Sequence, residues 1–375
     1  MKTTRILTVA LCAAGSAMLV AQEVPRLPPG AENAKPLSVQ APADPAYSLL
    51  TATCRTPPPG RGGNRGGGAG RGAAGRGPAA PQGIREYNVT EIPGVIKAGQ
   101  KWTFRWQEAG NNGDGIVGLP DGSLLLAQND NSQVLKLAPD GKTSVAYANT
   151  RTGGALSISA KGHMFIVERG LGLGARDHQR IEQLTPTRRV HADMFNGEPL
   201  DCIGGVINDI VADSKGGAYF TMGGLFYADK DGNVKRYGEN LTTNGVTLSP
   251  DEKTLYVTNG GTVAAFDVQA DGALTNQREF GKLTAGGGDG STIDGMGRVY
   301  TTSGAGVEVF DKTGKHLGVI PTPRGVITAA FGGKDRKTLF ILARGGTSST
   351  GEEVANVAQV WTIPMVAQGF KGRAK

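Results

Sequence analysis

The stretch LTTNGVTLSPDEKTLYVTN, residues 241–259, carries the local signals that decide how the whole chain folds. Asn244 and a glycine lead into an alternating strand, Val246–Leu248, which ends in the turn sequence SPD at 249–251. Proline presets φ at the second turn position, and an aspartate side chain can close the turn on its own backbone. The run Thr254–Thr258 is rich in β-formers and returns as a second strand. We therefore expect a β-hairpin with an amide displayed ahead of its first strand.

This hairpin pattern occurs six times, and helical periodicity is nearly absent between the copies. The copies begin near residues 114, 154, 208, 244, 289 and 327, and further strand candidates follow each of them. About forty residues and four strands per unit is the spacing of a β-propeller. Closing six sheets in a ring leaves only short sheet edges. The sequence predicts an all-β, six-bladed β-propeller with four-stranded blades over residues 86–375, and Lys101–Trp106 is expected to close the ring with the last blade.

Four of the copies carry a polar residue at the same phase, immediately before the first strand. These residues are Asp114, Asn208, Asn244 and Asp289. The first strand of each propeller blade lines the central channel, so equivalent positions converge near the axis. Two carboxylates and two amides form an all-oxygen set, which suits a hard cation such as Ca²⁺. Each Asp-Gly or Asn-Gly pair is also a common turn, but turn chemistry does not require the same register in four copies.

Other polar and aromatic residues have a simpler structural interpretation. The Asp-x-x-Gly sequences at Asp121, Asp213 and Asp294 are predicted to be turns. The three tryptophans are assigned to packing. His191 has an acidic neighbour two residues later but is expected to be a solvated loop residue. No Cys/His cluster of zinc spacing and no G-x-S-x-G nucleophile motif is present in the sequence.

The N-terminal part of the chain differs in composition from the rest. Residues 1–21 combine Lys2 and Arg5 with a short apolar run and small residues, which is typical of a secretory signal peptide and too short for a membrane span. Residues 22–85 are rich in Pro, Gly, Ala and Arg and are predicted to be a disordered linker. We therefore expect a secreted or periplasmic protein.

The basic charge belongs to this N-terminal part. Residues 1–85 contain ten Lys and Arg and three Asp and Glu, an excess of seven that equals the net charge of +7 of the whole chain. Residues 86–375 therefore balance, so no nucleic-acid partner is expected for the folded part. The Arg-Gly tail is a candidate contact for the cell envelope or for polyanions, and a plain spacer is the alternative. Without the signal peptide, Cys54 and Cys202 remain, either paired or as two free thiols.

The chain resembles the SMP-30/gluconolactonase/LRE-like family of six-bladed propellers over about residues 110–365. The opening hairpin resembles the family's Asn-Gly-(small apolar)-Ser-Pro-Asp blade. Three other segments are also similar to family motifs: FNGEPLDCIGGVINDIVADSKGGAYFT at 195–221, GDGSTIDGMGRVYTT at 288–302 and AAFGGKDRKTLFIL at 329–342. The resemblance implies a propeller fold and divalent-metal lactone hydrolysis.

The resemblance also implies roles for individual residues. Asp114 stands where the family has the Glu of a Glu-Gly-Pro motif, so it is the first metal ligand, one methylene shorter. Asn244 corresponds to the family's Asn ligand, and Asp289 to the Asp that is both ligand and candidate base. Asn208 corresponds to the substrate-side Asn. An Arg that holds sugar acids in some members is replaced by Val206, and Met222 stands where an Asp often follows Phe-Thr, which favours a different or less polar substrate.

Two functions follow from this pattern. The first is hydrolysis of a lactone or related ester, in which a bound divalent cation, Ca²⁺ or another, activates a water, Asp289 accepts its proton and Asn208 binds the carbonyl. The second is a non-catalytic secreted propeller that binds a ligand or partner and whose cation is structural. The departures at Asp114 and at residues 206 and 222 keep the second function open.

Overall fold

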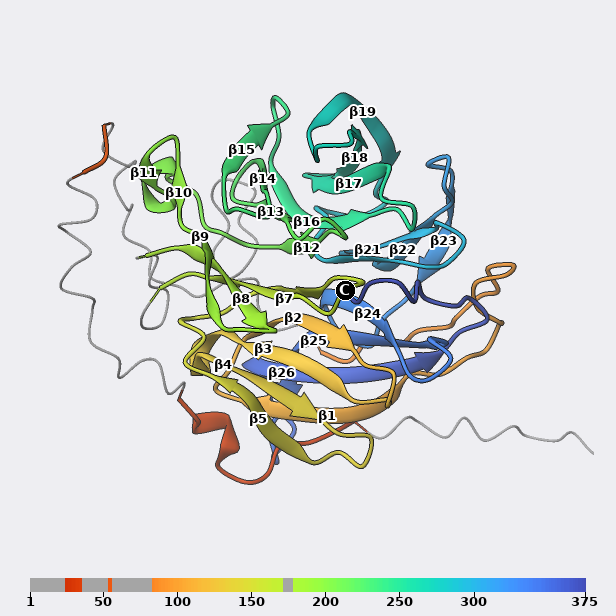
Figure 1. Cartoon of the computed structure of the whole chain (residues 1–375). Helices are drawn as coiled ribbons and strands as arrows, with labels where there is room; N and C mark the ends of the chain where they lie inside the picture. Colours follow the sequence, from red (N-terminus) through yellow and green to blue (C-terminus); the bar gives the residue numbers. More distant parts are fainter. Residues whose placement is uncertain (1–23, 36–52, 56–82, 171–177) are drawn as a thin grey trace, which may run out of the picture.

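The computed structural model describes residues 24–35, 53–55, 83–170 and 178–375, which form a ring of six antiparallel sheets with four strands each (Figure 1). The predicted six-bladed propeller is confirmed. In each of blades 1 to 5 the strands pair in sequence order, and the first strands of neighbouring blades contact one another around the axis. The first strands therefore line a central channel.

Five blades are continuous in sequence. Blade 1 contains β2 (Gly113–Gly118), β3 (Leu124–Gln128), β4 (Gln133–Leu137) and β5 (Thr143–Ala148). Blade 2 contains β6 (Leu156–Ile158), β7 (Met164–Glu168), β8 (Arg180–Thr185) and β9 (Arg189–Ala192). Blade 3 contains β12 (Ile210–Ala212), β13 (Ala218–Thr221), β14 (Leu225–Ala228) and β15 (Val234–Tyr237). Blade 4 contains β16 (Thr243–Leu248), β17 (Thr254–Asn259), β18 (Thr262–Val268) and β19 (Leu274–Lys282). Blade 5 contains β20 (Ser291–Ile293), β21 (Val299–Ser303), β22 (Gly306–Phe310) and β23 (His316–Ile320).

Blade 6 closes the ring by combining both ends of the propeller sequence. Its strands β24 (Val326–Gly332), β25 (Thr338–Thr347) and β26 (Glu353–Pro364) are completed by β1 (Thr103–Ala109), which pairs antiparallel with β26. The predicted closing strand is thus confirmed. Trp102, just ahead of β1, is 1% exposed and its Nε1 donates to the Pro321 carbonyl at 2.8 Å. This buried indole fixes the point where the chain enters the ring.

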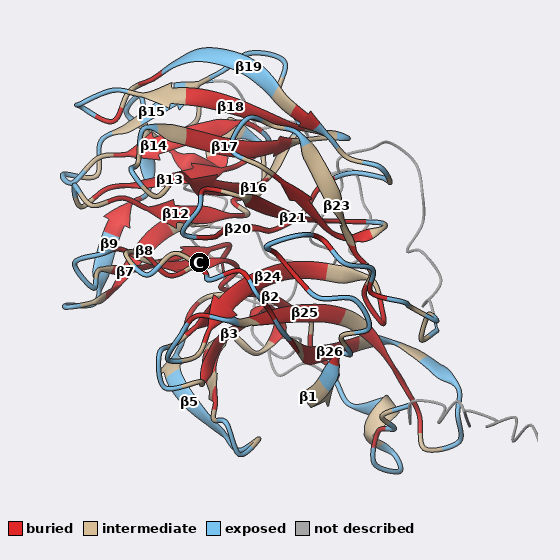
Figure 2. Ribbon diagram, turned by 90° about the vertical axis from the view of Figure 1, so that its right-hand side faces the viewer, coloured by how far each residue is buried: buried red, intermediate tan, exposed pale blue. Residues whose placement is uncertain are grey.

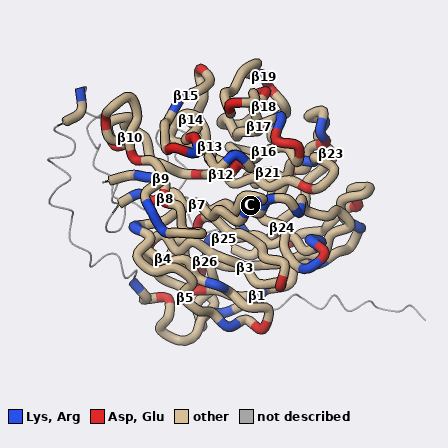
Figure 3. The backbone as a smooth tube through the Cα atoms, viewed as in Figure 1, with Lys and Arg blue, Asp and Glu red and all other residues tan. Residues whose placement is uncertain are grey.

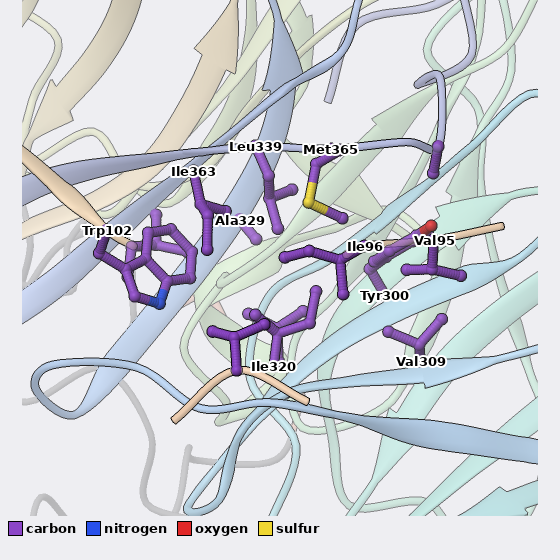
Figure 4. Close-up of a cluster of buried hydrophobic side chains, with 14 of the residues drawn as sticks. Val95, Ile96, Trp102, Tyr300, Val309, Ile320, Ala329, Leu339, Ile363 and Met365 are labelled. Carbon is purple, nitrogen blue, oxygen red and sulfur yellow. The ribbon is translucent and has the colours of Figure 1, made fainter. Parts of the chain in front are cut away.

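The hydrophobic core lies between the blades and extends under the entry segment. Figure 2 shows the burial concentrated in the inner strands, whereas the outer strands β5 and β19 are largely exposed. Figure 4 shows one cluster in which Val95, Ile96 and Trp102 pack with residues of blades 5 and 6, such as Tyr300 and Leu339. Residues 89–102 are therefore an integral part of the fold that covers blades 5 and 6.

The predicted turns also form as expected. Asp121 Oδ1 accepts from the Ser123 amide at 2.9 Å, and Asp213 Oδ1 accepts from the Gly217 amide at 2.8 Å. Asp294 Oδ1 likewise accepts from the Met296 amide at 2.9 Å. All three side chains are thus turn residues. His191, in contrast, is not a solvated loop residue: it lies on β9, is 5% exposed and packs edge-on against Phe165.

Two described parts of the N-terminal segment contact the propeller. Leu27 is buried, its amide donates to the Thr347 carbonyl at 2.8 Å, and the short 3-10 helix η1 (Ala31–Asn33) follows. Cys54 forms a disulfide with Cys202, with a Cα–Cα distance of 5.4 Å. Residues 24–35 and 53–55 therefore differ from the disordered linker expected for 22–85, because a buried leucine, backbone hydrogen bonds and a covalent bond offset the ordering entropy. The signal peptide at 1–21 and the Arg-Gly repeats lie outside the described residues.

A small excursion and the last residues complete the structure. Between blades 2 and 3 lie the hairpin β10 (Met194–Phe195) and β11 (Glu198–Pro199) and the 3-10 helix η4 (Leu200–Ile203), and η3 (Asn129–Asn131) follows β3. Residues 365–375 cross one end of the channel, so the chain end lies at the centre of the ring in Figure 1. Bridges Ile158–Ala374 and Asp294–Gly369 hold this segment.

Charged side chains of both signs are spread over the propeller without a single basic face (Figure 3). Among the described residues, no helix is long and apolar enough to span a membrane.

Candidate functional site

The four in-phase polar residues lie at the end of the channel opposite residues 365–375. Asp114 and Asn244 belong to β2 and β16, and Asn208 and Asp289 come just before β12 and β20. The ladder register shifts between Gly113 and Ile116, and again between Thr243 and Val246. Asp114 and Asn244 therefore sit on β-bulges, which can re-aim a side chain out of the regular alternation. The sequence predicted the phase correctly but placed both residues ahead of their strands.

Glycines after the polar residues let the inner strands approach closely. A Cβ on Gly245 would lie 2.0 Å from the Asp289 carbonyl oxygen, and a Cβ on Gly290 would lie 2.3 Å from Thr328 Oγ1. Real Cβ atoms essentially never come this near another atom. These glycines thus set the spacing between blades 4, 5 and 6, and through it the separation of the functional side chains.

A buried arginine connects three of the blades at this site. Arg169 follows β7, is 7% exposed, and its Nη2 lies 2.6 Å from Asp114 Oδ2 and 2.9 Å from Asn208 Oδ1. Its Nε donates to the Ile207 carbonyl at 3.0 Å. Asn208 Nδ2 in turn donates to Asn244 Oδ1. A continuous chain of polar contacts therefore runs from Asp114 through Arg169 and Asn208 to Asn244.

Asp289 stands apart from this chain of contacts. Among the described residues its carboxylate makes no hydrogen bond or ion pair within bonding distance. Burial, followed by the negative charge of Asp114, raises the pKa of Asp289 to about 8, although Arg344 acts in the opposite direction. A carboxyl group with a pKa near neutrality can exchange a proton under ordinary conditions. Asp289 is thus the carboxyl group of this site that no described side chain holds by a hydrogen bond or ion pair.

A second buried pair supports the site from the channel side. Asp209 is next to Asn208, and its Oδ2 accepts from the Val246 amide at 2.7 Å and lies 2.5 Å from Lys375 Nζ. Lys375 Nζ also donates to the Ile210 carbonyl at 2.8 Å. These contacts tie the segment at one end of the channel to the strand entries of blades 3 and 4. Asp209 and Lys375 therefore fix the backbone from which Asn208 projects.

Sequence reasoning missed Arg169, Asp209 and Lys375. Asp209 directly follows the expected Asn208, but nothing local distinguishes it from a turn residue. The sequence gives a weak indication of Arg169, because two charged residues, Glu168 and Arg169, directly follow the apolar run Met164–Val167. Both are buried in the structure. Nothing in the sequence indicates the role of Lys375, because its partner Asp209 comes near it only when the ring closes.

The residues fit a divalent cation in the type of ligand they offer. Asp114 and Asp289 supply carboxylates, and Asn208 and Asn244 supply amide oxygens, which hard cations accept. In the described part of the chain no group of three or more His, Cys, Asp or Glu side chains is arranged so that it could hold a metal ion. The set therefore depends on its two amides, and two of its four side chains are already in contact with the Arg169 guanidinium.

Comparisons with known proteins agree with this architecture. The profile of the SMP-30/Gluconolactonase/LRE-like region matches residues 113–345. A gluconolactonase of Zymomonas mobilis is 24% identical over 276 residues, covering 61% of this chain and 75% of that protein. Lactonase drp35 of Staphylococcus saprophyticus is 30% identical over 233 residues, covering 55% of this chain and 62% of that protein.

Solved structures share the same fold at lower sequence identity. A gluconolactonase structure from Xanthomonas campestris superposes with a TM-score of 0.54 at 21% identity, covering 75% of this chain and all of that one. The matched profile extends over more than half of the chain and includes all four in-phase residues. The chain belongs to the SMP-30/gluconolactonase/LRE-like family.

Proposed function

We propose that this chain hydrolyses lactones or related carboxylic esters at the end of the channel that holds Asp114, Asn208, Asn244 and Asp289. The named relatives are a gluconolactonase and a lactonase, which supports lactone hydrolysis in general. The observation that carries the proposal is the convergence of Asp114, Asn208 and Asn244 at one end of the channel with Asp289, a carboxyl group of raised pKa that makes no hydrogen bond or ion pair among the described residues. Such a group suits a general base in hydrolysis.

The proposal includes a divalent cation held by Asp114, Asn244 and Asp289, with Ca²⁺ as the simplest choice and other divalent cations open. When bound, such a cation polarises an ester carbonyl and makes a nearby water more acidic. The cation's identity is a prediction from ligand type. Its binding is tested separately from hydrolysis below.

The chain's own side chains account for the proton movements. Asp289 takes a proton from the attacking water, whose oxygen forms a bond with the carbonyl carbon. Asn208 uses one N–H for Asn244 and has a second N–H that can donate to the carbonyl oxygen as negative charge develops on it. The ester C–O bond then breaks, and Asp289 returns the proton to the leaving oxygen. The products are a carboxylic acid, which releases its proton to the solvent and becomes a carboxylate, and a hydroxyl group; in a lactone both belong to one hydroxy acid.

The substrate is expected to be less polar than a sugar-acid lactone. Val206 and Met222 are both apolar, and Met222 is buried at 2% exposure. Neither side chain can supply the hydrogen bond to a sugar hydroxyl that an Arg or Asp at its position could give. Aliphatic lactones therefore belong in the substrate panel beside sugar-acid lactones.

Proton release from a lactone panel, measured by pH-stat with and without Ca²⁺ and with chelator, tests the proposal. We expect Asp289→Asn to lower kcat/KM by about 100-fold or more, because it removes the base but keeps the shape. Asp231→Asn is the matched control, since Asp231 lies in an exposed turn of blade 3 and pairs only with Lys230. Equal activity of Asp289→Asn and wild type would contradict the assignment.

The non-catalytic propeller is the second candidate. The contacts of Arg169 favour it, because a permanent guanidinium on Asp114 and Asn208 suits binding of an anionic group as well as catalysis. Absence of turnover across the whole panel, with saturable binding of a panel compound by calorimetry, would select this function.

A further inference from the structure

Arg169 makes its contacts with atoms that a cation would also use. The Asp114 Oδ2 atom lies 2.6 Å from its Nη2, and the Asn208 Oδ1 atom lies 2.9 Å from the same nitrogen. A guanidinium nitrogen at these distances takes one acceptor position on each of these two oxygens. With Arg169 in place, Asn244 Oδ1 also accepts from Asn208 Nδ2, so Asp289 is the one member of the four whose side chain makes no hydrogen bond among the described residues. Ca²⁺ takes about 6–8 oxygens, so this single side chain is a poor site.

The position of the guanidinium is built by several elements. A Cβ on Gly154 would lie 2.8 Å from Arg169 Nη2, so any other residue at this position would force the guanidinium to shift. The Ile207 carbonyl accepts from Nε at 3.0 Å. In the orientation that satisfies its hydrogen bonds, the Asn129 side-chain oxygen accepts from Nη1 at 2.8 Å and its nitrogen donates to the Gly153 carbonyl. Blades 1, 2 and 3 thus all contribute to holding this one side chain.

The positive charge of Arg169 weakens cation binding, as do its hydrogen bonds to the two oxygens. The guanidinium carries a permanent positive charge and is 7% exposed, so its repulsion of a divalent cation is only partly screened by water. A cation that takes Asp114 must also displace Arg169 from a buried ion pair, which leaves the guanidinium to find other partners. Both effects weaken cation binding without removing any ligand.

We propose that Arg169 is a built-in competitor of the divalent cation: it holds Asp114 and Asn208 when no cation is bound and thereby sets how tightly the cation binds. The inference rests on the cation site of the proposed function and adds the residue that regulates it. Its consequence is counterintuitive for a buried residue of the site, since removing Arg169 strengthens cation binding.

Isothermal titration calorimetry of Ca²⁺ into the full chain, freed of metal, tests this competition. We expect Arg169→Met to bind Ca²⁺ at least about tenfold more tightly than wild type, within the usual range of coupling between two ligands of one site. Arg169→Gln is the second variant; it keeps a hydrogen-bond donor for Asp114 without the charge, so it reports the effect should Arg169→Met fold poorly. Arg278→Met controls for net charge, because it removes an exposed guanidinium whose partner is Asp267 on the outside of blade 4.

A double-mutant comparison locates the effect at Asp114. In the Asp114→Asn background the gain from Arg169→Met should shrink, because the contested carboxylate is gone. Affinities in Arg169→Met and Arg169→Gln that equal or fall below wild type overturn the inference, as does absence of cation binding in all variants. Lactone hydrolysis measured on the same preparations separates the two proposals. Hydrolysis without cation binding overturns the competitor and the cation of the proposed function but leaves lactone hydrolysis standing, whereas Arg169-dependent cation binding without hydrolysis overturns the lactonase alone.

Discussion

Single residues decide the geometry of this site as much by the space they leave as by the groups they offer. Gly245 brings blade 4 against the backbone of Asp289, where a Cβ would lie 2.0 Å from a carbonyl oxygen. Gly154 leaves room for the Arg169 guanidinium. The polar side chains could not converge if ordinary residues stood at these positions. These glycines therefore determine how closely the polar side chains approach one another at this end of the channel.

Gly245→Ala should destabilise the protein by about 1–3 kcal/mol, since the added methyl group forces the Asp289 backbone away from β16. Activity should fall with stability, because Asp289 moves. The free energy of unfolding from urea denaturation and kcat/KM on the best panel lactone measure both effects.

Gly325→Ala is the matched control for this substitution, because no atom lies within 4 Å of a Cβ at that position. A Gly245→Ala protein as stable as this control would show that the inner strands can separate without cost.

At the scale of the elements, the polar residues of the site lie at the ends of inner strands, whereas outer strands can contribute side chains to the core. In blade 2, Arg169 directly follows β7, while β9 supplies His191 to the core beside Phe165. Burial, followed by the charge of Arg189, lowers the pKa of His191 below its ordinary value. The folded blade thus requires a neutral imidazole between its strands.

Acid should destabilise the protein partly through His191. The unfolded chain takes up a proton near pH 6.5 while the folded chain resists it, so this contribution is complete at higher pH and is lost as the pH falls from 6.5 through the folded pKa. The loss is at most about 1.4 kcal/mol per pH unit. In His191→Leu the decrease in unfolding free energy between pH 7.5 and pH 5.5 should be smaller than in wild type.

Urea denaturation at the two pH values measures this difference. His163→Gln is the control, because that side chain is only partly buried. An identical pH dependence in wild type and His191→Leu would assign the acid sensitivity to other groups.

At the scale of the whole molecule, three connections turn six blades into one unit. The β1–β26 pairing closes the ring, residues 365–375 cross one end of the channel, and the disulfide attaches Cys54 to Cys202. The disulfide joins positions 148 residues apart, so it constrains a large part of the unfolded chain. Such bonds persist in oxidising compartments, and we propose, together with the N-terminal pattern at 1–21, that the protein works outside the cytoplasm.

Replacing both cysteines, Cys54→Ser with Cys202→Ser, should lower the free energy of unfolding by about 2–5 kcal/mol. Reductant should reproduce the loss in wild type and leave the double variant unchanged. Protein recovered from the periplasm or medium should contain no free thiol at these positions, and a free thiol in that fraction would refute the export proposal.

The sequence by itself determined the repeating unit and the phase of its polar residues. Hairpin turns, alternating strands and glycines are local signals that act within about ten residues. The six copies and the closing strand at 101–106 could therefore be predicted. The same holds for the positions of the four in-phase polar residues, Asp114, Asn208, Asn244 and Asp289. The structural turns at Asp121, Asp213 and Asp294 follow from the same local chemistry.

Only the tertiary structure decided which groups share the site. Arg169 reaches Asp114 across 55 positions of sequence, and Lys375 reaches Asp209 across more than 160. No local pattern encodes such pairs, since they arise when ring closure buries charges that must then find partners. The order of residues 24–35 has the same origin, because Leu27 gains a buried position only once the propeller surface exists. The sequence therefore specifies the polar groups, and closure of the ring decides which of them Arg169 holds and which, like the Asp289 carboxylate, make no hydrogen bond among the described residues.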